Sequence, residues 1–285
     1  MDERIGRPVL ITQAVSVSAS VVRQARSLRQ IFVGAIGLLF LTEASALNLD
    51  QFSPKEIDQL TSVLAQLDPL ISHRKHDGTV NLIRWEELYE PLTPEARIFL
   101  DACRAIKAET LGSTSHLFGE SDTPQDLVRL GPQTVTKNGQ PSPLDEQYLP
   151  REVFDAYTRM TAAMERDLGR RLLVESGYRS PAYQLYLFLF YMPKHGYSMR
   201  QTNRFVALPG YSEHGNPARQ AIDFINQDGI NGEDHPEEFE ALPEYQWLLQ
   251  HARAFGFSLS YPRDNPHNTA FEPWHWHYEK TVHGP

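Results

Sequence analysis

The chain has 285 residues, of which 41% are hydrophobic and 22% are charged, so it is large enough for one or two globular domains with a buried core. Its net charge of -9 argues against a nucleic-acid-binding protein, because such proteins usually present a basic face. The single cysteine, Cys103, excludes an internal disulfide and a cysteine-rich zinc module, and we expect it to be a buried structural residue.

The first 46 residues have the pattern of a secretory signal rather than that of a folded segment. Three arginines precede the short apolar run Ile31–Leu41, and Ala44-Ser45-Ala46 supplies small residues at the positions that a signal peptidase reads. The run is well short of the ~20 residues that span a bilayer. We therefore expect residues 1–46 to be a signal peptide, or a membrane anchor if the leader stays uncleaved. Export to the periplasm or cell surface of a bacterium is expected, with anchoring to the inner membrane as the alternative.

Residues 47–112 are expected to form a mainly helical N-terminal region. A helix start is indicated where Ser53, a proline, a lysine and Glu56 provide the cap and the first turn, and apolar residues then recur at helical spacing. Asp68-Pro69 is predicted to end this helix. Thr93, followed by proline and glutamate, predicts a second helix. No motif in this region assigns it a chemistry.

The rest of the chain divides into a linker-like segment and a second folded unit. Residues 113–146 are rich in Gly, Pro, Ser, Thr and Asp, and we expect them to be partly ordered at best. Residues 147–285 begin with an amphipathic helix, and short strands are predicted at Leu172–Val174 and Phe257–Tyr261, with a buried helix over Leu185–Met192. This order predicts an α+β fold, with helices flanking a small antiparallel sheet.

Two histidines, one aspartate and one glutamate are spread over three blocks of this second unit. Asp223 lies in an otherwise apolar strand, where a carboxylate is costly unless it is paired or binds a metal. His214 precedes that strand, and His275 lies between two tryptophans, where a strand can direct it to the same point. Glu272 stands three residues before His275. These are the parts of a catalytic zinc site, in which three side chains hold the metal, the fourth position is open to water and a separate carboxylate acts as base.

Four blocks in a defined order carry a resemblance to a known family. They are Ser176-Gly177-Tyr178-Arg179-Ser180, then Ser212-Glu213-His214 with Ala221-Ile222-Asp223-Phe224, then Gly256-Phe257 with Tyr261-Pro262, and last Glu272-Pro273-Trp274-His275-Trp276. Together they resemble the zinc D-alanyl-D-alanine carboxypeptidases of the VanY type, part of a wider peptidoglycan-peptidase group that includes lysostaphin-like enzymes. The resemblance covers about residues 147–280 and leaves residues 47–146 outside.

The resemblance implies a role for each residue that matches the motifs. Zn²⁺ would be held by His214, Asp223 and His275, and Glu272 would be the general base that takes a proton from the zinc-activated water and later gives it to the leaving amine. Arg179 would donate hydrogen bonds to the scissile carbonyl or to the substrate carboxylate. The substrate would be positioned by Ser212, with Gln184 supporting Arg179.

The chain departs from the family pattern at two places. The loop Gly215–Gln220 makes the spacing from His214 to Asp223 two residues longer than usual, which affects the shape of the loop more than the choice of ligands. His277 stands where arginine is common. On a strand it would point to the same face as His275, so it is a rival ligand, a partner of a ligand or a substrate contact.

The most direct functional hypothesis is a zinc metallopeptidase that trims peptidoglycan stem peptides, releasing the terminal D-alanine. Two alternatives stay open: an endopeptidase of the same fold, and a non-catalytic, zinc-stabilised module that binds the cell wall. Residues 47–146 are a candidate for a separate wall-binding or partner-binding domain. No nucleic-acid partner is expected, and contact with a membrane is expected only if the leader remains attached.

Overall fold

The N-terminal part of the described chain is helical. The structure is a computed structural model that describes residues 47–279, so the expected leader lies outside the described residues. The capping box is confirmed, because Ser53 N donates to Glu56 Oε2 at 2.6 Å and Glu56 N donates to Ser53 Oγ at 3.4 Å. The helical elements here are α1 Pro54–His76, the 3-10 helix η1 Val80–Leu82, α2 Trp85–Tyr89, α3 Pro94–Arg104 and η2 Ala108–Leu111.

The predicted end of the first helix is wrong. Helix α1 continues through Pro69 to His76. Pro69 has no N–H, so the carbonyl of residue 65 loses its helical hydrogen bond. Both Pro69 and residue 65 are exposed, so water can solvate that carbonyl instead. Leu67 and Ile71, on either side of the proline, are buried. Burial of this apolar face outweighs the lost bond.

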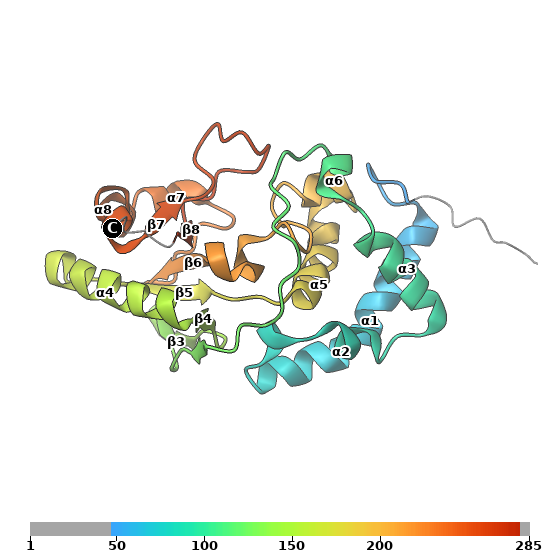
Figure 1. The fold of residues 1–285 in the computed structure, drawn as a ribbon, viewed down its shortest axis with the longest axis horizontal. Helices are drawn as coiled ribbons and strands as arrows, with labels where there is room; N and C mark the ends of the chain where they lie inside the picture. The colour runs from blue at the N-terminus through green and yellow to red at the C-terminus, as the bar shows by residue number, and fades with distance from the viewer. Residues whose placement is uncertain (1–46, 280–285) are drawn as a thin grey trace, which may run out of the picture. The chain divides into compact units, whose positions relative to one another are not determined.

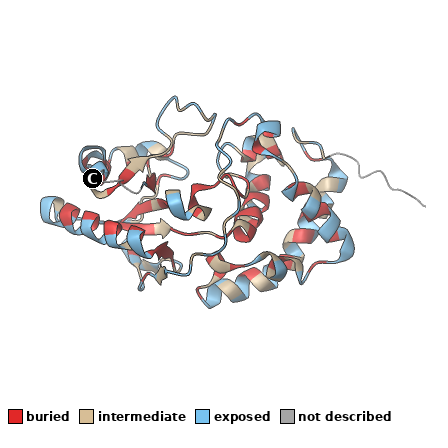
Figure 2. Cartoon of the chain, viewed as in Figure 1, coloured by how far each residue is buried: buried red, intermediate tan, exposed pale blue. Residues whose placement is uncertain are grey.

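The N-terminal helices share one hydrophobic core with helix α5 (Pro181–Tyr191). Ser180 caps α5 by accepting from Tyr183 N at 3.2 Å, and the expected buried helix is confirmed, although Phe190 is exposed. Figure 1 shows α5 between the helices α1–α3 and the sheet, and Figure 2 shows how much of α5 is buried. The described residues 47–279 accordingly belong to one compact unit.

A four-stranded antiparallel sheet organises the second half, which confirms the predicted α+β fold. Its order is β5-β6-β8-β7. Strand β7 ends at Leu259 rather than at the predicted Tyr261. Helices α4 and α8 pack with the sheet around a second core, and α4 ends at Gly169, which has a positive φ of 66°. The elements are α4 Arg151–Leu168, β5 Leu172–Ser176, β6 Ala221–Asn226, α7 Pro236–Glu240, α8 Pro243–His251, η6 Ala252–Phe255, β7 Phe257–Leu259 and β8 His275–Tyr278.

The segment expected to be linker-like contains three short strands. β1 Leu127–Arg129 pairs with β4 Tyr148–Pro150, and β2 Thr134–Lys137 pairs with β3 Gln140–Pro143. Gln133 holds this segment to the sheet, because its side chain bonds both N and O of Val174 at 2.9 Å. The β1–β4 pair joins residues on either side of a hairpin, so local composition does not reveal it. The β2–β3 hairpin turns at Asn138-Gly139, a local signal that the sequence analysis missed.

Short helical elements connect α5 to β6 and carry part of the site. They are η3 Met192–His195, α6 Met199–Thr202, η4 Glu213–Gly215 and η5 Pro217–Arg219. Across residues 47–279, we find no helix with the length and apolar character needed to cross a membrane.

Candidate metal centre and substrate cleft

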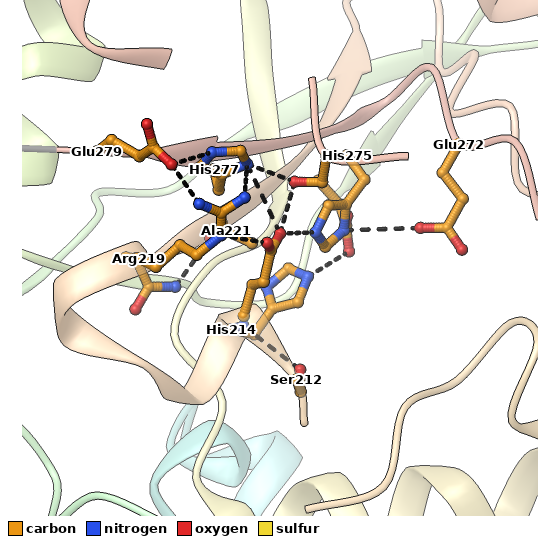
Figure 3. Close-up of polar contacts among 12 residues, drawn as sticks. Ser212, His214, Arg219, Ala221, Glu272, His275, His277 and Glu279 are labelled. Atoms are coloured by element: carbon orange, nitrogen blue, oxygen red, sulfur yellow. Dashed lines mark hydrogen bonds and ion pairs between the residues drawn. The ribbon is translucent and has the colours of Figure 1, made fainter. Parts of the chain in front are cut away.

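His214, Asp223 and His275 converge from three elements of the chain. His214 lies in η4, and the pairing of β6 with β8 places Asp223 directly opposite His275. Asp223 Oδ1 is 2.8 Å from His275 Nδ1, and Asp223 Oδ2 is 3.1 Å from His214 Nε2. One donor atom from each residue lies within 4.8 Å of the others. Figure 3 shows the two histidine rings facing the same point.

The protonation pattern of His214 suits a metal ligand. Its Nδ1 lies 2.7 Å from the carbonyl oxygen of Gly177, so this nitrogen carries the proton and donates it. Its Nε2 is buried and makes no hydrogen bond, despite its nearness to Asp223. Burial, followed by the charge of Arg179, lowers the pKa of His214 to about 4, so the ring is neutral at neutral pH. Two imidazole nitrogens and a carboxylate oxygen form a donor set that zinc takes. The residues present therefore fit the expected metal.

The other two donors are strongly coupled to each other. Burial would raise the pKa of Asp223, but its contacts with the two histidines hold the value well below the usual range. Burial would lower the pKa of His275, but Asp223 and Glu213 outweigh it and raise the value to about 10. A metal ion bound by Asp223 and His275 would compete with this proton for the same atoms.

Glu213 orients His275, a role that the sequence analysis missed. Its Oε2 is 3.0 Å from His275 Nε2, and it also accepts from Ser260 Oγ at 2.5 Å. Arg219 Nε donates to Oε1 at 2.6 Å. A carboxylate on the outer nitrogen of a metal-binding histidine sets its tautomer and ring direction. The only sequence signal of this role is the position of Glu213 immediately before His214. In the structure Glu213 contacts the more distant His275 rather than its neighbour His214.

His277 belongs to the surroundings of Glu213. Its Nδ1 is 2.7 Å from Ser260 Oγ, and its Nε2 is 3.1 Å from Glu279 Oε1. Arg219 is paired with Glu279 as well. His277 does not share the point where the three donor atoms meet within the described chain. Its Nδ1 is also 3.8 Å from Glu213 Oε2, so this geometry favours a supporting role that reaches His275 through Glu213. Figure 3 shows His275 between Glu272 on one side and the group of His277, Arg219 and Glu279 on the other.

Glu272 is a buried carboxylate beside the three donors. Its Oε2 is 3.7 Å from His275 Nδ1. Backbone bonds hold the turn around it, from Glu272 N to Tyr261 O at 3.1 Å and from His275 N to Glu272 O at 3.2 Å. Burial raises the pKa of Glu272 to about 8, and the negative charge of Asp223 adds to this rise. A carboxylate whose proton affinity lies near neutrality is suited to take up and return a proton.

A cleft of about 490 Å³ opens over the candidate metal centre. Its walls include the three donors, Glu272, Arg179 and Ser212. A carboxylate on strand β5, Glu175, also faces it. Burial raises the pKa of Glu175 to about 7, and Asn231 Nδ2 donates to its Oε1 at 2.8 Å. The volume is in the range of pockets that bind small ligands.

The cleft contains two of the three expected substrate-positioning residues. Arg179 N donates to His214 O at 3.1 Å, and its side-chain Nε is buried without a hydrogen-bond partner. Ser212 lines the cleft, and its Oγ accepts from His214 N at 3.3 Å. Gln184 is buried and donates to Ala207 O at 2.7 Å. Over residues 47–279, Gln184 neither lines the cleft nor bonds to Arg179.

Comparisons with known proteins agree on one group. The sequence profile of the family described as "VanY: D-alanyl-D-alanine carboxypeptidase" matches residues 146–281. The chain is 31% identical over 142 residues to VanXYC of Enterococcus gallinarum, described as a bifunctional D-Ala-D-Ala dipeptidase and D-Ala-D-Ala carboxypeptidase, covering 48% of this chain and 70% of that one.

Two further similarities each cover about half of this chain. YodJ of Bacillus subtilis (strain 168), which is named as a carboxypeptidase, is 31% identical over 137 residues, covering 47% of this chain and 48% of that one. The present chain therefore spans about half the length of YodJ. Among solved structures, the LdcB LD-carboxypeptidase is 29% identical with a TM-score of 0.43, covering 54% of this chain and 68% of that one.

Proposed function

This chain belongs to the VanY family of D-alanyl-D-alanine carboxypeptidases, and we propose that it is a zinc metallopeptidase that releases the terminal D-alanine from peptidoglycan stem peptides. The observation that carries the proposal is the meeting of His214, Asp223 and His275 at one point of a cleft, with Glu272 beside them. Burying this many titratable groups costs folding free energy unless they bind a metal, and such clusters are typical of functional sites.

The chemistry divides between the metal and the side chains of the chain. A zinc ion held by the three donors supplies Lewis-acid activation of water and of the scissile carbonyl. Glu272 accepts a proton from the attacking water and returns it to the leaving amine, which its burial and its place in the cleft support. Arg179 presents a planar set of donors, and the unpartnered Nε supports its use by a carbonyl or carboxylate of the substrate.

The choice of a terminal bond rests on the relatives. VanXYC is named as a D-Ala-D-Ala dipeptidase and D-Ala-D-Ala carboxypeptidase, and YodJ is named as a carboxypeptidase. An endopeptidase would use the same metal centre with a cleft that accepts chain on both sides of the bond. A non-catalytic binding module would have no need for Glu272 beside the donors. The substrate lies outside the cytoplasm, so we also propose that the chain is exported by the leader expected at residues 1–46.

Mass spectrometry of reaction products tests this function. Residues 47–285, which include the compact unit of the described residues 47–279, would be incubated with pentapeptide-bearing and tetrapeptide-bearing muropeptides, with added zinc or with a chelator. We expect a zinc-dependent loss of one alanine from the pentapeptide. Zinc-dependent cleavage of an internal bond would replace the carboxypeptidase by an endopeptidase. Zinc binding without any cleavage would favour the binding module.

A further inference from the structure

The turn that carries Arg179 is braced by residues outside the family match. Ser180 N donates to Asn81 O at 2.9 Å, and Ser180 Oγ donates to Ile83 O at 2.5 Å. The side chain of Asn81 donates to Gln147 Oε1 at 3.2 Å, and the same oxygen accepts from Gly177 N at 3.0 Å. Both ends of this turn are thus tied to the segment that follows α1.

The loop that carries Ser212, Glu213 and His214 is braced in the same way. Phe118 N and Gly119 N both donate to Gly210 O, at 2.8 and 3.1 Å. Tyr211 OH donates to Glu109 Oε2 at 2.7 Å, and the Tyr211 ring is buried in the core shared with the N-terminal helices. Gly210 has a φ of 80°, and a Cβ there would lie 3.4 Å from both Gly119 C and Leu117 Cδ1. The N-terminal segment is therefore in close contact with this loop.

The same segment forms part of the cleft itself. Ala108 and Ser115 are among the lining residues. Thr114 Oγ1 donates to Pro266 O at 2.6 Å, which joins the segment to the chain between β7 and Glu272. Figure 1 shows the stretch between η2 and β1 passing between the helical half and the sheet. The segment 108–119 thus contacts the loop that carries His214 and the chain that leads to the candidate base, Glu272.

We propose that residues 108–119 are a specificity-determining wall of the cleft and the positioning support of the loop Gly210–His214. The N-terminal region is then part of the catalytic unit and not a separate wall-binding module. The identity of the substrate in this proposal rests on the proposed function. The positioning role of Glu109, which acts through Tyr211, does not.

Glu109→Ala tests the positioning role. Loss of the acceptor should increase amide hydrogen exchange across residues 210–214 and lower kcat/KM about tenfold, because a hydrogen bond to a charged group is removed. Glu109→Gln keeps an acceptor oxygen and should restore most of both. Glu165→Ala, on the exposed side of α4, is the matched control. Exchange and kcat/KM in Glu109→Ala equal to those of Glu165→Ala would overturn the positioning role.

Ser115→Trp tests the wall, with Ser62→Trp on the exposed side of α1 as the control for bulk. We expect KM to rise about tenfold in Ser115→Trp, with kcat and zinc affinity within about twofold of the unmodified protein. An unchanged KM would overturn the wall. If the unmodified, zinc-loaded protein cleaves no stem peptide, the proposed function and the wall fail together, whereas the exchange measurement still decides the positioning role.

Discussion

The two halves of the molecule have cores of similar apolar character but different buried polar groups. Among the described residues 47–112, Asn81 is the one polar side chain in the buried class. The sheet half buries several titratable groups: Glu213, His214, Glu244, Glu272, His275 and His277. Burying such groups costs free energy unless they are paired. Their concentration in one half agrees with the position of the candidate metal centre there.

Removing the candidate base in the sheet half should abolish most of the catalytic activity without disturbing the fold. Glu272→Gln keeps the size of the side chain but cannot accept the proton, so kcat should fall by about 10²–10⁴-fold. Zinc affinity should change little, because Glu272 is not one of the three donors. Steady-state kinetics and a chelator competition would measure both. Retained turnover in Glu272→Gln would show that another group moves the proton.

Truncating the N-terminal core tests whether the two halves fold together. Leu100 is fully buried in the core that includes α5, so Leu100→Ala should lower the free energy of unfolding by about 2–5 kcal/mol. Ile98→Ala, on the exposed side of the same helix, should have almost no effect. Denaturant unfolding followed by circular dichroism and by tryptophan fluorescence should give one shared transition. Two separate transitions would mean that the N-terminal helices are an independent domain.

Glu175, in the sheet half, should make the free energy of unfolding depend on pH. Its pKa is raised by burial from 4.5 to about 7, so the folded protein holds a proton that the unfolded chain releases in this range. The contribution of Glu175 to the free energy of unfolding is fully present below pH 4.5 and is lost as the pH rises through 7. Glu175→Gln in the metal-free protein should therefore be more stable than the unmodified chain at pH 8, by up to about 3 kcal/mol.

The control for this prediction lies in the N-terminal half. Glu86 is exposed on α2, so Glu86→Gln is the control for the same substitution at a position outside the cleft. Urea unfolding at pH 4 and at pH 8 would measure the effect. An equal gain of Glu175→Gln at the two pH values would rule out the titration of Glu175 as its cause.

The support of His275 by Glu213 should affect metal binding more than folding. Glu213→Ala removes the acceptor on His275 Nε2, and we expect zinc affinity to fall about 10–100-fold. Glu279→Ala, at the exposed end of the same network, should leave the affinity within about twofold. Competition with a chromophoric chelator would measure both dissociation constants. Equal affinities in the two variants would contradict the role of Glu213.

Much of the fold followed from local signals. The serine before α1 stands at the helix start as predicted, because such a cap depends on neighbouring residues alone. The continuation of α1 past Pro69 was missed, since it depends on what Leu67 and Ile71 pack against. Strand β1 was missed because its partner β4 begins only at Tyr148. Strands β2 and β3 were missed despite a local signal, since the turn Asn138-Gly139 joins them as a hairpin.

The sequence by itself determined which side chains have the chemistry of a metal site. His214, Asp223, His275 and Glu272 stand out because a carboxylate in an apolar strand and a histidine between tryptophans need a partner. Only the tertiary structure decided how these residues are supported. Glu213 bonds to a histidine 62 positions away, and Glu109 bonds to a tyrosine 102 positions away. Such contacts are set by strand register and helix packing over the whole chain, which no local pattern encodes.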